Sequence, residues 1–439
     1  MRKLKITALV LLCIITAGLC GIFAYGMTGH DIYRIGDGGR WNDDGFADAY
    51  GSPQLVLEKE VSLDGIDSIS IQYNMNSNDI YLYESENENV TIKEYSELDL
   101  AEDMFSTVTV KGSSLEVRGK KRDGRSYQIR VGMFGIRTAV CYTEIGLPSS
   151  YKGKLALSTV SGDISSRMDI VLDKDFTAST SSGDVNVPLI TAENVTVECT
   201  SGNVKIETIC ADSGSSVGEI HITTSSGDID GKQFSGDVRL KSTSGDIEVN
   251  QLMGDADIES SSGYVEAEAI SGETQIATTS GNIKIRQIDG TAMLRTSSGD
   301  VAVYEGSGGR TAKTTSGDVT LNGLEGVWDI ETSSGGVELD AAKGSGRIAT
   351  TSGDIRLEIG DITGNLDIQS SSGYAEIKMS PDNAFDFKAS TSSGDIGTFF
   401  DDSLSFSKKG NEAHGTYGEN SGNRDVVIRT TSGDIRITK

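Results

Sequence analysis

The most constraining feature of this chain is a period of 18 residues that runs from Gly227 to Gly353 without an insertion or a deletion. Each repeat carries a Ser-Gly pair, usually followed by Asp, and a second glycine nine residues after the first. We call the glycine of the Ser-Gly pair the anchor glycine; the anchors are Gly227, Gly245, Gly263, Gly281, Gly299, Gly317, Gly335 and Gly353. A short fixed period is typical of a solenoid, because equivalent residues of successive repeats stack on one another.

The residues between the glycines predict β-strands. Aliphatic residues stand two and four positions after each anchor with mostly polar residues between them, which is typical of a strand with one buried face. The first inward column comprises Ile247, Val265, Ile283, Val301, Val319, Val337 and Ile355, and the second strand of each repeat supplies Ile258, Ile276, Leu294, Ala312, Ile330 and Ile348. We therefore predict an all-β fold, a parallel β-solenoid with two main sheets and 18-residue coils. The general rule for parallel crossovers predicts a right-handed coil.

Looser repeats extend this stack at both ends, with further anchors at Gly162, Gly183, Gly202, Gly373, Gly394 and Gly433. With a degenerate coil between Gly394 and Gly433, the stack would have about 15 coils and a length of roughly 70 Å at one strand spacing per coil. Glycine is expected at these turns either because φ is positive or because stacked backbones approach closely.

The N-terminus predicts a membrane segment over residues 1–27. A basic stretch from Met1 to Lys5 precedes 22 uncharged residues, Ile6 to Met27. A helix of this length spans a bilayer, and the basic flank stays in the cytoplasm. We therefore predict a single-pass anchor with the C-terminal ectodomain outside the cytoplasm. A cleavable signal peptide is the alternative, and it would make the protein secreted.

The remaining sequence divides into three parts. Residues 28–53 are rich in Gly and Asp and predict a linker. Residues 54–150 are β-rich without the period and predict an irregular N-terminal cap, whereas residues 151–439 hold the solenoid with a C-terminal cap. That cap is predicted where Leu404 to Asn423 breaks the period, near Phe385, Phe387, Phe399, Phe400 and Phe406. Caps protect the open edges of a solenoid from pairing with another chain.

The formal net charge of −26 restricts the partners. Nucleic-acid binding calls for a basic surface, so this class of partner is excluded. An anionic polymer is also disfavoured as a ligand unless cations bridge it to the protein, because the acidic protein would repel it.

Several segments resemble a known family. They include Leu63 to Ile71, Asn78 to Leu82, Ile145 to Ile164 and the closing Arg429 to Ile437, together with the Ser-Gly-Asp repeats between them. Over roughly residues 55–439 the chain resembles the bacterial β-strand-repeat family of “putative adhesins”, or autotransporter adhesin head-like proteins. The resemblance implies a β-solenoid at the cell surface or in the envelope, in some relatives linked to envelope stress, and it implies no active site.

An Asp column follows the anchor glycines and could in principle bind calcium, as stacked carboxylates do in calcium β-rolls. The double glycine of that repeat is missing here, so we expect instead that these side chains cap turn amides. The column comprises Asp163, Asp184, Asp228, Asp246, Asp300, Asp318, Asp354, Asp395 and Asp434, with Asn203, Tyr264, Asn282, Gly336 and Tyr374 at the same place in other coils.

Hydroxyl columns precede the anchors, formed by Thr278, Thr296, Thr314, Thr332 and Thr350 and by Ser280, Ser298, Ser316, Ser334 and Ser352. They could form a flat array for ice or glycan. We expect them to be internal, with hydroxyl groups bonding along the stack and to the turn backbone.

Two further motifs bear on chemistry. Gly214 to Gly218 matches the Gly-x-Ser-x-Gly elbow of hydrolases, with His221 nearby, but the strand–turn–helix context of that motif is missing. Cys199 and Cys210 could form a disulfide in an oxidising compartment or remain buried thiols. We therefore assign no catalytic, cofactor-binding or metal-ligating residue.

The sequence thus favours a membrane-anchored, extracytoplasmic adhesin-like interaction or envelope scaffold protein, without catalysis. Its expected partners are the cell membrane through the N-terminal helix and a cell-wall polymer or an envelope protein, with Tyr264, Tyr304 and Tyr374 as contact candidates. The alternatives are a calcium-binding β-roll and a carbohydrate-active β-helix enzyme, which needs carboxylates about 5–10 Å apart. The alternating outward charges, Glu266 before Lys284 for example, favour cross-strand pairs instead.

Overall fold

The computed structural model describes residues 53–73, 78–98, 100–120, 130–132, 135–137, 140–210, 218–419 and 424–439. All of them belong to the unit Ser52–Lys439. Within these ranges no helix has the length and apolar character that crossing a membrane would require. The predicted anchor 1–27 and nearly all of the predicted linker 28–53 lie outside the described residues, so both remain predictions.

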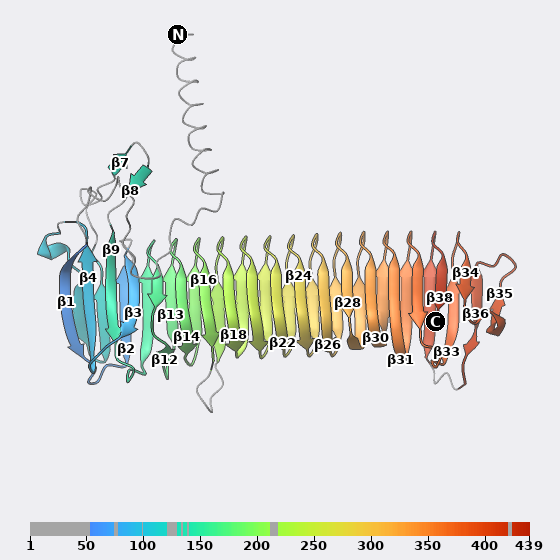
Figure 1. Cartoon of the computed structure of the whole chain (residues 1–439), viewed down its shortest axis with the longest axis horizontal. Helices are drawn as coiled ribbons and strands as arrows, with labels where there is room; N and C mark the ends of the chain where they lie inside the picture. Colours follow the sequence, from blue (N-terminus) through green and yellow to red (C-terminus); the bar gives the residue numbers. More distant parts are fainter. Residues whose placement is uncertain are drawn as a thin grey trace, which may run out of the picture. The chain divides into compact units, whose positions relative to one another are not determined.

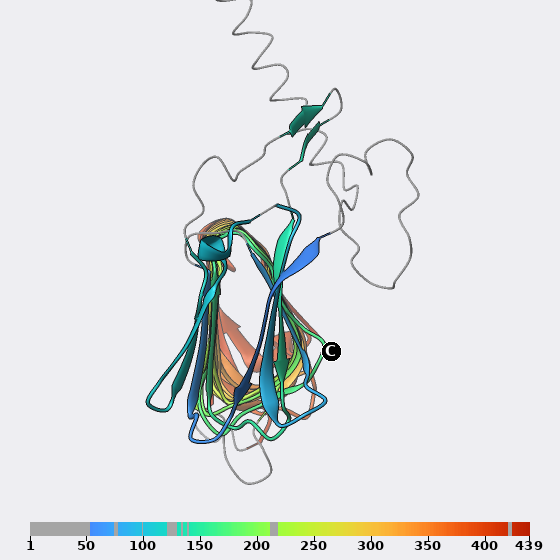
Figure 2. The ribbon, with the colours of Figure 1, turned by 90° about the vertical axis from the view of Figure 1, so that its left-hand side faces the viewer.

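The unit consists of parallel strands stacked coil upon coil (Figure 1). Each regular coil has an outgoing strand after its anchor glycine and a return strand before the next one, and the two walls face each other across one interior (Figure 2). The outgoing strands are β14 (Val185–Thr191), β16 (Val204–Ile209), β18 (Ile229–Ser235), β20 (Ile247–Met253), β22 (Val265–Ser271), β24 (Ile283–Asp289), β26 (Val301–Ser307) and β28 (Val319–Asn322). The return strands are β13 (Phe176–Thr180), β15 (Val195–Cys199), β17 (Glu219–Thr223), β19 (Asp237–Ser242), β21 (Ala256–Ser260), β23 (Thr274–Ala277), β25 (Ala292–Arg295), β27 (Arg310–Lys313) and β29 (Leu324–Glu331).

Equivalent residues of successive coils pair directly in this stack. Val301 pairs with Val319 and Val319 with Val337, and all three side chains are buried. The predicted solenoid fold and its register are therefore confirmed. The two walls, predicted as separate sheets, belong to a single sheet of 36 strands. Three strands run through the bend between the walls and join them, namely β29, β30 (Val337–Thr350) and β31 (Ile355–Ser370). The handedness of the coil stays a prediction.

The two glycine columns serve different needs. A Cβ atom on the anchor Gly281 would lie 1.8 Å from the carbonyl oxygen of Gly263, although the φ of Gly281 is not positive. Glycine is therefore required at the anchor position because the stacked backbones approach so closely that no Cβ atom fits between them. The second column, represented by Gly290, has a φ of +124°, and a Cβ there would lie 2.3 Å from the oxygen of Gly272. Left-handed backbone and close approach together require glycine at this place.

The N-terminal coils do not stack in the order of the sequence. The elements here are β1 (Gln54–Ser62), β2 (Ser68–Tyr73), β3 (Asp79–Glu84), β4 (Asn89–Ser96), η1 (Glu102–Met104), β5 (Thr107–Lys111), β6 (Ser114–Arg118), β7 (Arg130–Gly132), β8 (Gly135–Arg137), β9 (Cys141–Leu147), β10 (Lys154–Thr159), β11 (Ile164–Ser166) and β12 (Ile170–Val171). β6 and β9 pair with one side of β2 and β3, and β10 and β11 pair with the other side. The first coil of the chain thus lies inside the stack. Antiparallel strands extend the stack on the side of β6 and β9: β5 pairs with β6, β4 pairs with β9, and β1 pairs with β4. β7 and β8 form a separate sheet.

The C-terminal end is interleaved in the same way. The elements are β32 (Ala375–Met379), β33 (Phe385–Ser390), β34 (Ile396–Thr398), η2 (Asp401–Ser403), β35 (Leu404–Phe406), β36 (Glu412–Tyr417), β37 (Asp425–Thr430) and β38 (Ile435–Thr438). β37 pairs with β31 on one side and β33 on the other, and β38 pairs likewise with β32 and β34 (Figure 1). The predicted order, with the Gly433 coil last after a degenerate coil, is therefore wrong. Anchor Gly433 stacks between Gly373 and Gly394.

The segment after β34 closes this end of the stack. β36 pairs antiparallel with β33 and β35. Phe385, Phe387, Phe399 and Phe400 pack against one another and against Tyr417, with ring centroids 4.8–6.5 Å apart. Phe406, predicted to belong to the same aromatic cap, is instead 40% exposed.

Candidate functional site

The Asp column hydrogen-bonds the backbone of the following coil. Asp228 Oδ1 accepts the N–H of Asp246 at 2.9 Å, and Asn282 Oδ1 accepts that of Asp300 at the same distance. The column therefore has the capping role we expected, but its target is the equivalent residue one coil away rather than an amide of its own turn. Among the described residues, no group of three or more His, Cys, Asp or Glu side chains is placed to hold a metal ion.

Asp163 of this column is half-buried, as is Asp79, whose Oδ1 accepts the backbone N–H of Asp163 at 2.9 Å. Burial raises the pKa of Asp79 and of Asp163, and the hydrogen bond from the next backbone N–H partly opposes the rise in each. Ionisation of a carboxyl group is therefore less favourable at this end of the column than in water.

The two hydroxyl columns differ in environment. Thr314 is buried, donates to the carbonyl oxygen of Gly299 at 3.0 Å and accepts the N–H of Gly317 at 3.1 Å. The threonine column is therefore internal, as expected. The serine column is exposed, contrary to the expectation; Ser316 is an example. In the regular coils, as at Thr296, Thr314, Thr332 and Thr350, an internal hydroxyl joins the anchor glycine to the anchor of the preceding coil.

Cys199 takes the place of threonine in its coil. Its Sγ donates to the carbonyl oxygen of Gly183 at 3.2 Å and accepts the N–H of Gly202 at 3.0 Å. Burial raises the pKa of this thiol. Cys199 and Cys210 are both free, so the disulfide alternative is wrong in this structure.

Arg310 is a buried cation that the sequence reasoning missed. It occupies an inward position of the return wall and is 2% exposed. Its guanidinium donates to the carbonyl oxygens of Ser307 at 2.7 Å and Gly309 at 3.2 Å, and also to those of Ile288 and Gly290. Burial lowers its pKa. A Cβ on Gly306 would lie 2.8 Å from Nη2, so this glycine makes room for the guanidinium.

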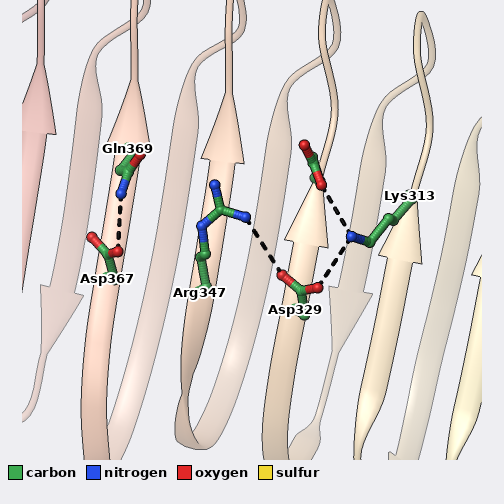
Figure 3. A network of polar contacts seen from close by, with 6 residues as sticks. Lys313, Asp329, Arg347, Asp367 and Gln369 are labelled. Carbon is green, nitrogen blue, oxygen red and sulfur yellow. Dashed lines mark hydrogen bonds and ion pairs between the residues drawn. The ribbon is translucent and has the colours of Figure 1, made fainter.

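The outer face of the return wall carries a network of charged side chains (Figure 3). Lys313 Nζ lies 3.0 Å from Glu331 Oε2 and 3.2 Å from Asp329 Oδ2. The hydrogen bonds to these two carboxylates raise the pKa of Lys313, and the one to Glu331 has the larger effect. Arg347 approaches Asp329 only to 3.9 Å. Opposite charges on neighbouring coils balance one another along the wall.

The same wall continues this pattern towards the C-terminal end. Arg429 Nη1 lies 2.8 Å from Asp367 Oδ1, and the amide nitrogen of Gln369 donates to Asp367 Oδ2 at 2.9 Å. The outgoing wall carries the cross-strand pairs predicted there, Lys284 with Glu266 and Arg286 with Glu268.

A hollow of about 300 Å³ lies beside this network, which we call the return-wall groove. It is lined by Glu331, Thr332, Ser333, Arg347, Ala349, Thr350, Thr351, Gln369, Ser370, Ser371, Arg429, Thr430 and Thr431. Ala349 stands in line with Glu331 and Gln369 of the adjacent coils, so its short side chain leaves the space open. A second hollow, of about 350 Å³, uses equivalent positions near the other end, such as Ser158, Ser179 and Glu198.

Of the other residues singled out from the sequence, those that the structure describes do not meet at one place. Residues 211–217 lie outside the described ranges, so the Gly-x-Ser-x-Gly segment is not described. His221 Nε2 lies 3.1 Å from Thr223 Oγ1 on the return wall. Tyr264 and Tyr304 are 40% and 41% exposed, whereas Tyr374 lies under the guanidinium of Arg356 at 5.1 Å.

The sequence held a signal for the groove that our reasoning did not use. The residue four positions before each anchor faces outward on the return wall, and this column contains Ala277, Arg295, Lys313, Glu331, Ala349, Gln369 and Arg429. In this column Ala349 stands between the long side chains of Glu331 and Gln369, but only the stacking order shows that Arg429 follows Gln369.

Stacked parallel coils around one interior define this protein as a β-solenoid. The sequence profile of the Toastrack DUF4097 family matches residues 66–274 and 310–438, and the chain belongs to that family. This confirms the family resemblance inferred from the sequence motifs. No curated protein matches the chain significantly.

Solved structures give a weaker comparison. A “putative cell adhesion protein” of Clostridium sporogenes shares 9% identity at a TM-score of 0.19, with 88% of this chain and 99% of that chain covered. A “putative lipid binding protein” of Parabacteroides distasonis shares 13% identity at a TM-score of 0.20, with 89% and 98% covered. A “putative adhesin” of Parabacteroides merdae shares 12% identity at a TM-score of 0.19, with 89% and 98% covered. At such TM-scores these similarities carry no conclusion about this chain.

Proposed function

We propose that this protein is a membrane-anchored, extracytoplasmic β-solenoid that acts as an adhesin-like surface interaction or envelope scaffold protein, without catalysis. In this proposal the segment 1–27 holds the protein in the membrane and the solenoid contacts a polymer or a protein of the cell surface.

The observation that carries the proposal is the repetitive polar face of the return wall. Its charged side chains pair from coil to coil, Lys313 with Glu331 and Arg429 with Asp367 for example. A stack of repeats supplies a long, regular binding surface because each coil contacts its neighbours and shares one core. A recognition group that recurs at each coil suits an extended partner.

The sequence supports the membrane part of the proposal. Arg2, Lys3 and Lys5 precede the uncharged run Ile6 to Met27. Such a run is long enough for the hydrocarbon core of a bilayer, and the basic flank favours retention of the N-terminus in the cytoplasm.

Membrane fractionation tests the location. The full-length chain, made in a bacterial host, should sediment with membranes. Protease added to spheroplasts of that host, in which the outer face of the cytoplasmic membrane is accessible, should digest the solenoid. Replacing Leu12 and Ile15 with lysine should abolish sedimentation, because two charges at mid-bilayer oppose insertion. N-terminal sequencing separates the retained anchor from the cleaved, secreted form. A wild-type protein that stays protease-protected in the cytoplasm would overturn the proposal.

Adhesion is tested with the same cells. Cells that display the wild-type protein should bind to cell-wall material more than cells that carry the Leu12→Lys/Ile15→Lys variant. Equal binding by both would contradict a surface role.

A further inference from the structure

We propose that the return-wall groove binds a neutral, hydroxyl-rich polysaccharide that runs along the direction of stacking. This inference rests on the proposed surface function and names the class of ligand that the groove would hold.

The lining of the groove is polar almost throughout. Ala349 is its only apolar side chain, and the remaining lining residues carry hydroxyl, guanidinium, amide or carboxylate groups. Pockets for lipids or drug-like molecules are lined mainly by apolar side chains, and the centres of protein interfaces need apolar anchors. The groove offers neither, so a highly hydroxylated ligand fits it better.

Two planar groups at the groove have hydrogen-bonding capacity to spare. The Arg347 guanidinium approaches Asp329 only to 3.9 Å, which is beyond hydrogen-bonding distance, so its N–H groups can donate to a ligand. Gln369 uses its amide nitrogen on Asp367 and keeps its carbonyl oxygen as an acceptor. Neighbouring hydroxyl groups of a sugar ring both donate and accept, and therefore match such a pair.

The geometry brings these two groups to the same hollow. Ala349 lies directly opposite Gln369 in the pairing of β30 with β31. Arg347 precedes Ala349 by two residues on the same strand, so both face the same side of the wall. The donor and the acceptor therefore flank the space that the short Ala349 side chain leaves.

Hydroxyl groups repeat along the axis beside this hollow. Ser333, Thr351, Ser371 and Thr431 are exposed, line the groove and belong to four successive coils of the stack. Their spacing is about 4.8 Å, the distance between neighbouring strands. An extended polymer would meet the same type of group at every coil, so weak contacts would add along its length.

Charge favours a neutral ligand over an anionic one. The ion pairs of Lys313 with Glu331 and Arg429 with Asp367 are balanced, and the chain as a whole carries −26. An anionic polymer would therefore be repelled at long range, whereas a neutral polymer pays no such penalty.

Affinity electrophoresis of the full-length protein tests the inference. Gels that contain dextran or mannan should retard the wild-type chain, and gels that contain polygalacturonate should not. Ala349→Trp should fill the hollow and weaken retardation about tenfold, as should Arg347→Ala through the loss of a charged donor. The matched control is Ala277→Trp in the same outward column, which should bind as the wild type does. Unchanged unfolding curves should show that the variants are folded.

Three outcomes would overturn the inference. They are the absence of retardation by either neutral polysaccharide, equal effects of Ala349→Trp and Ala277→Trp, and stronger retention on polygalacturonate or on a gelatin-coated surface. If neutral polysaccharides fail but cells displaying the protein still adhere, the ligand class is wrong and the surface function stands. If the protein is protease-protected in the cytoplasm, the surface function itself fails.

Discussion

Asp300 Oδ1 accepts a hydrogen bond from the backbone N–H of Asp318, its counterpart one coil later, at 2.9 Å. Asp318 repeats the contact with the N–H of Gly336 at 2.7 Å. Gly336 has no side chain to continue the series, so this column of contacts stops before Asp354. The Asp Oδ1 atoms thus link successive coils, and this link is missing between Gly336 and Asp354.

Gly336→Asn should therefore stabilise the protein. Asn203 and Asn282 already accept the next N–H at this place, and a Cβ on Gly336 would meet its nearest atom, the Asp354 carbonyl oxygen, at an ordinary 3.5 Å. We expect a gain of about 1 kcal/mol in the free energy of unfolding from the new hydrogen bond, measured by urea denaturation. Gly336→Ala is the control for the loss of glycine alone, which stabilises through the unfolded chain. No advantage of Asn over Ala would contradict the capping role.

Asp163→Asn should stabilise the protein at neutral pH but not in acid. Burial raises the pKa of Asp163 above its usual 3.8, so the folded state binds the proton more tightly than the unfolded state. This tighter proton binding adds to the free energy of unfolding below pH 3.8, and the gain is lost as the pH rises through the raised pKa of Asp163. Asn keeps the acceptor oxygen and removes this loss. Urea denaturation at pH 3 and pH 7 checks the difference, with Asp228→Asn at an exposed place of the column as the control.

Thr314→Val should destabilise the stack by about 1–3 kcal/mol, because it leaves the buried N–H of Gly317 without its acceptor. Thr314→Ser should recover most of the loss, since Ser242 makes both contacts in its own coil. Thr315→Val, at the exposed neighbour, serves as the control. Thermal unfolding of the three variants distinguishes these cases, and equal melting temperatures for Thr314→Val and Thr314→Ser would argue against the hydroxyl bridge.

Deletion of residues 424–439 should release the C-terminal cap. These residues form β37 and β38, which separate β31 and β32 from β33 and β34, so their loss removes an inner coil and not the last one. Hydrogen exchange should show lost protection in β33 and β36 and retained protection in β20 to β26. The exposed strand edges should also promote association, measured by gel filtration. A cap that keeps its protection after the deletion would show that the coils stack in sequence order.

The repeat made much of the fold predictable because its period is local. Val301, Val319 and Val337 recur at a fixed interval, and only a stack of equal coils buries all of them in one column. The internal threonines followed from the same reasoning. The exposed serine column could not be predicted in this way, because the direction of a turn side chain depends on how neighbouring coils pack. The burial of Arg310 could not be predicted either, because it depends on the space that Gly306 leaves.

The candidate site was less accessible to sequence reasoning. The column with Ala349 and Gln369 is visible in the repeat, but Arg429 joins it only because the final coil is inserted ahead of an earlier one. Nothing in the spacing of Gly394 and Gly433 reveals that exchange.

By itself the sequence determined the secondary structure, the register of the coils and the identity of the core, because short-range periodicity fixes which side of each strand faces inward. Tertiary structure alone decided the order of the terminal coils, the joining of the two walls into one sheet and the residues that surround the groove. Those features depend on which strand pairs with a free strand edge of the stack. The short-range sequence pattern does not decide this, because every free edge with the same register could pair with the incoming strand.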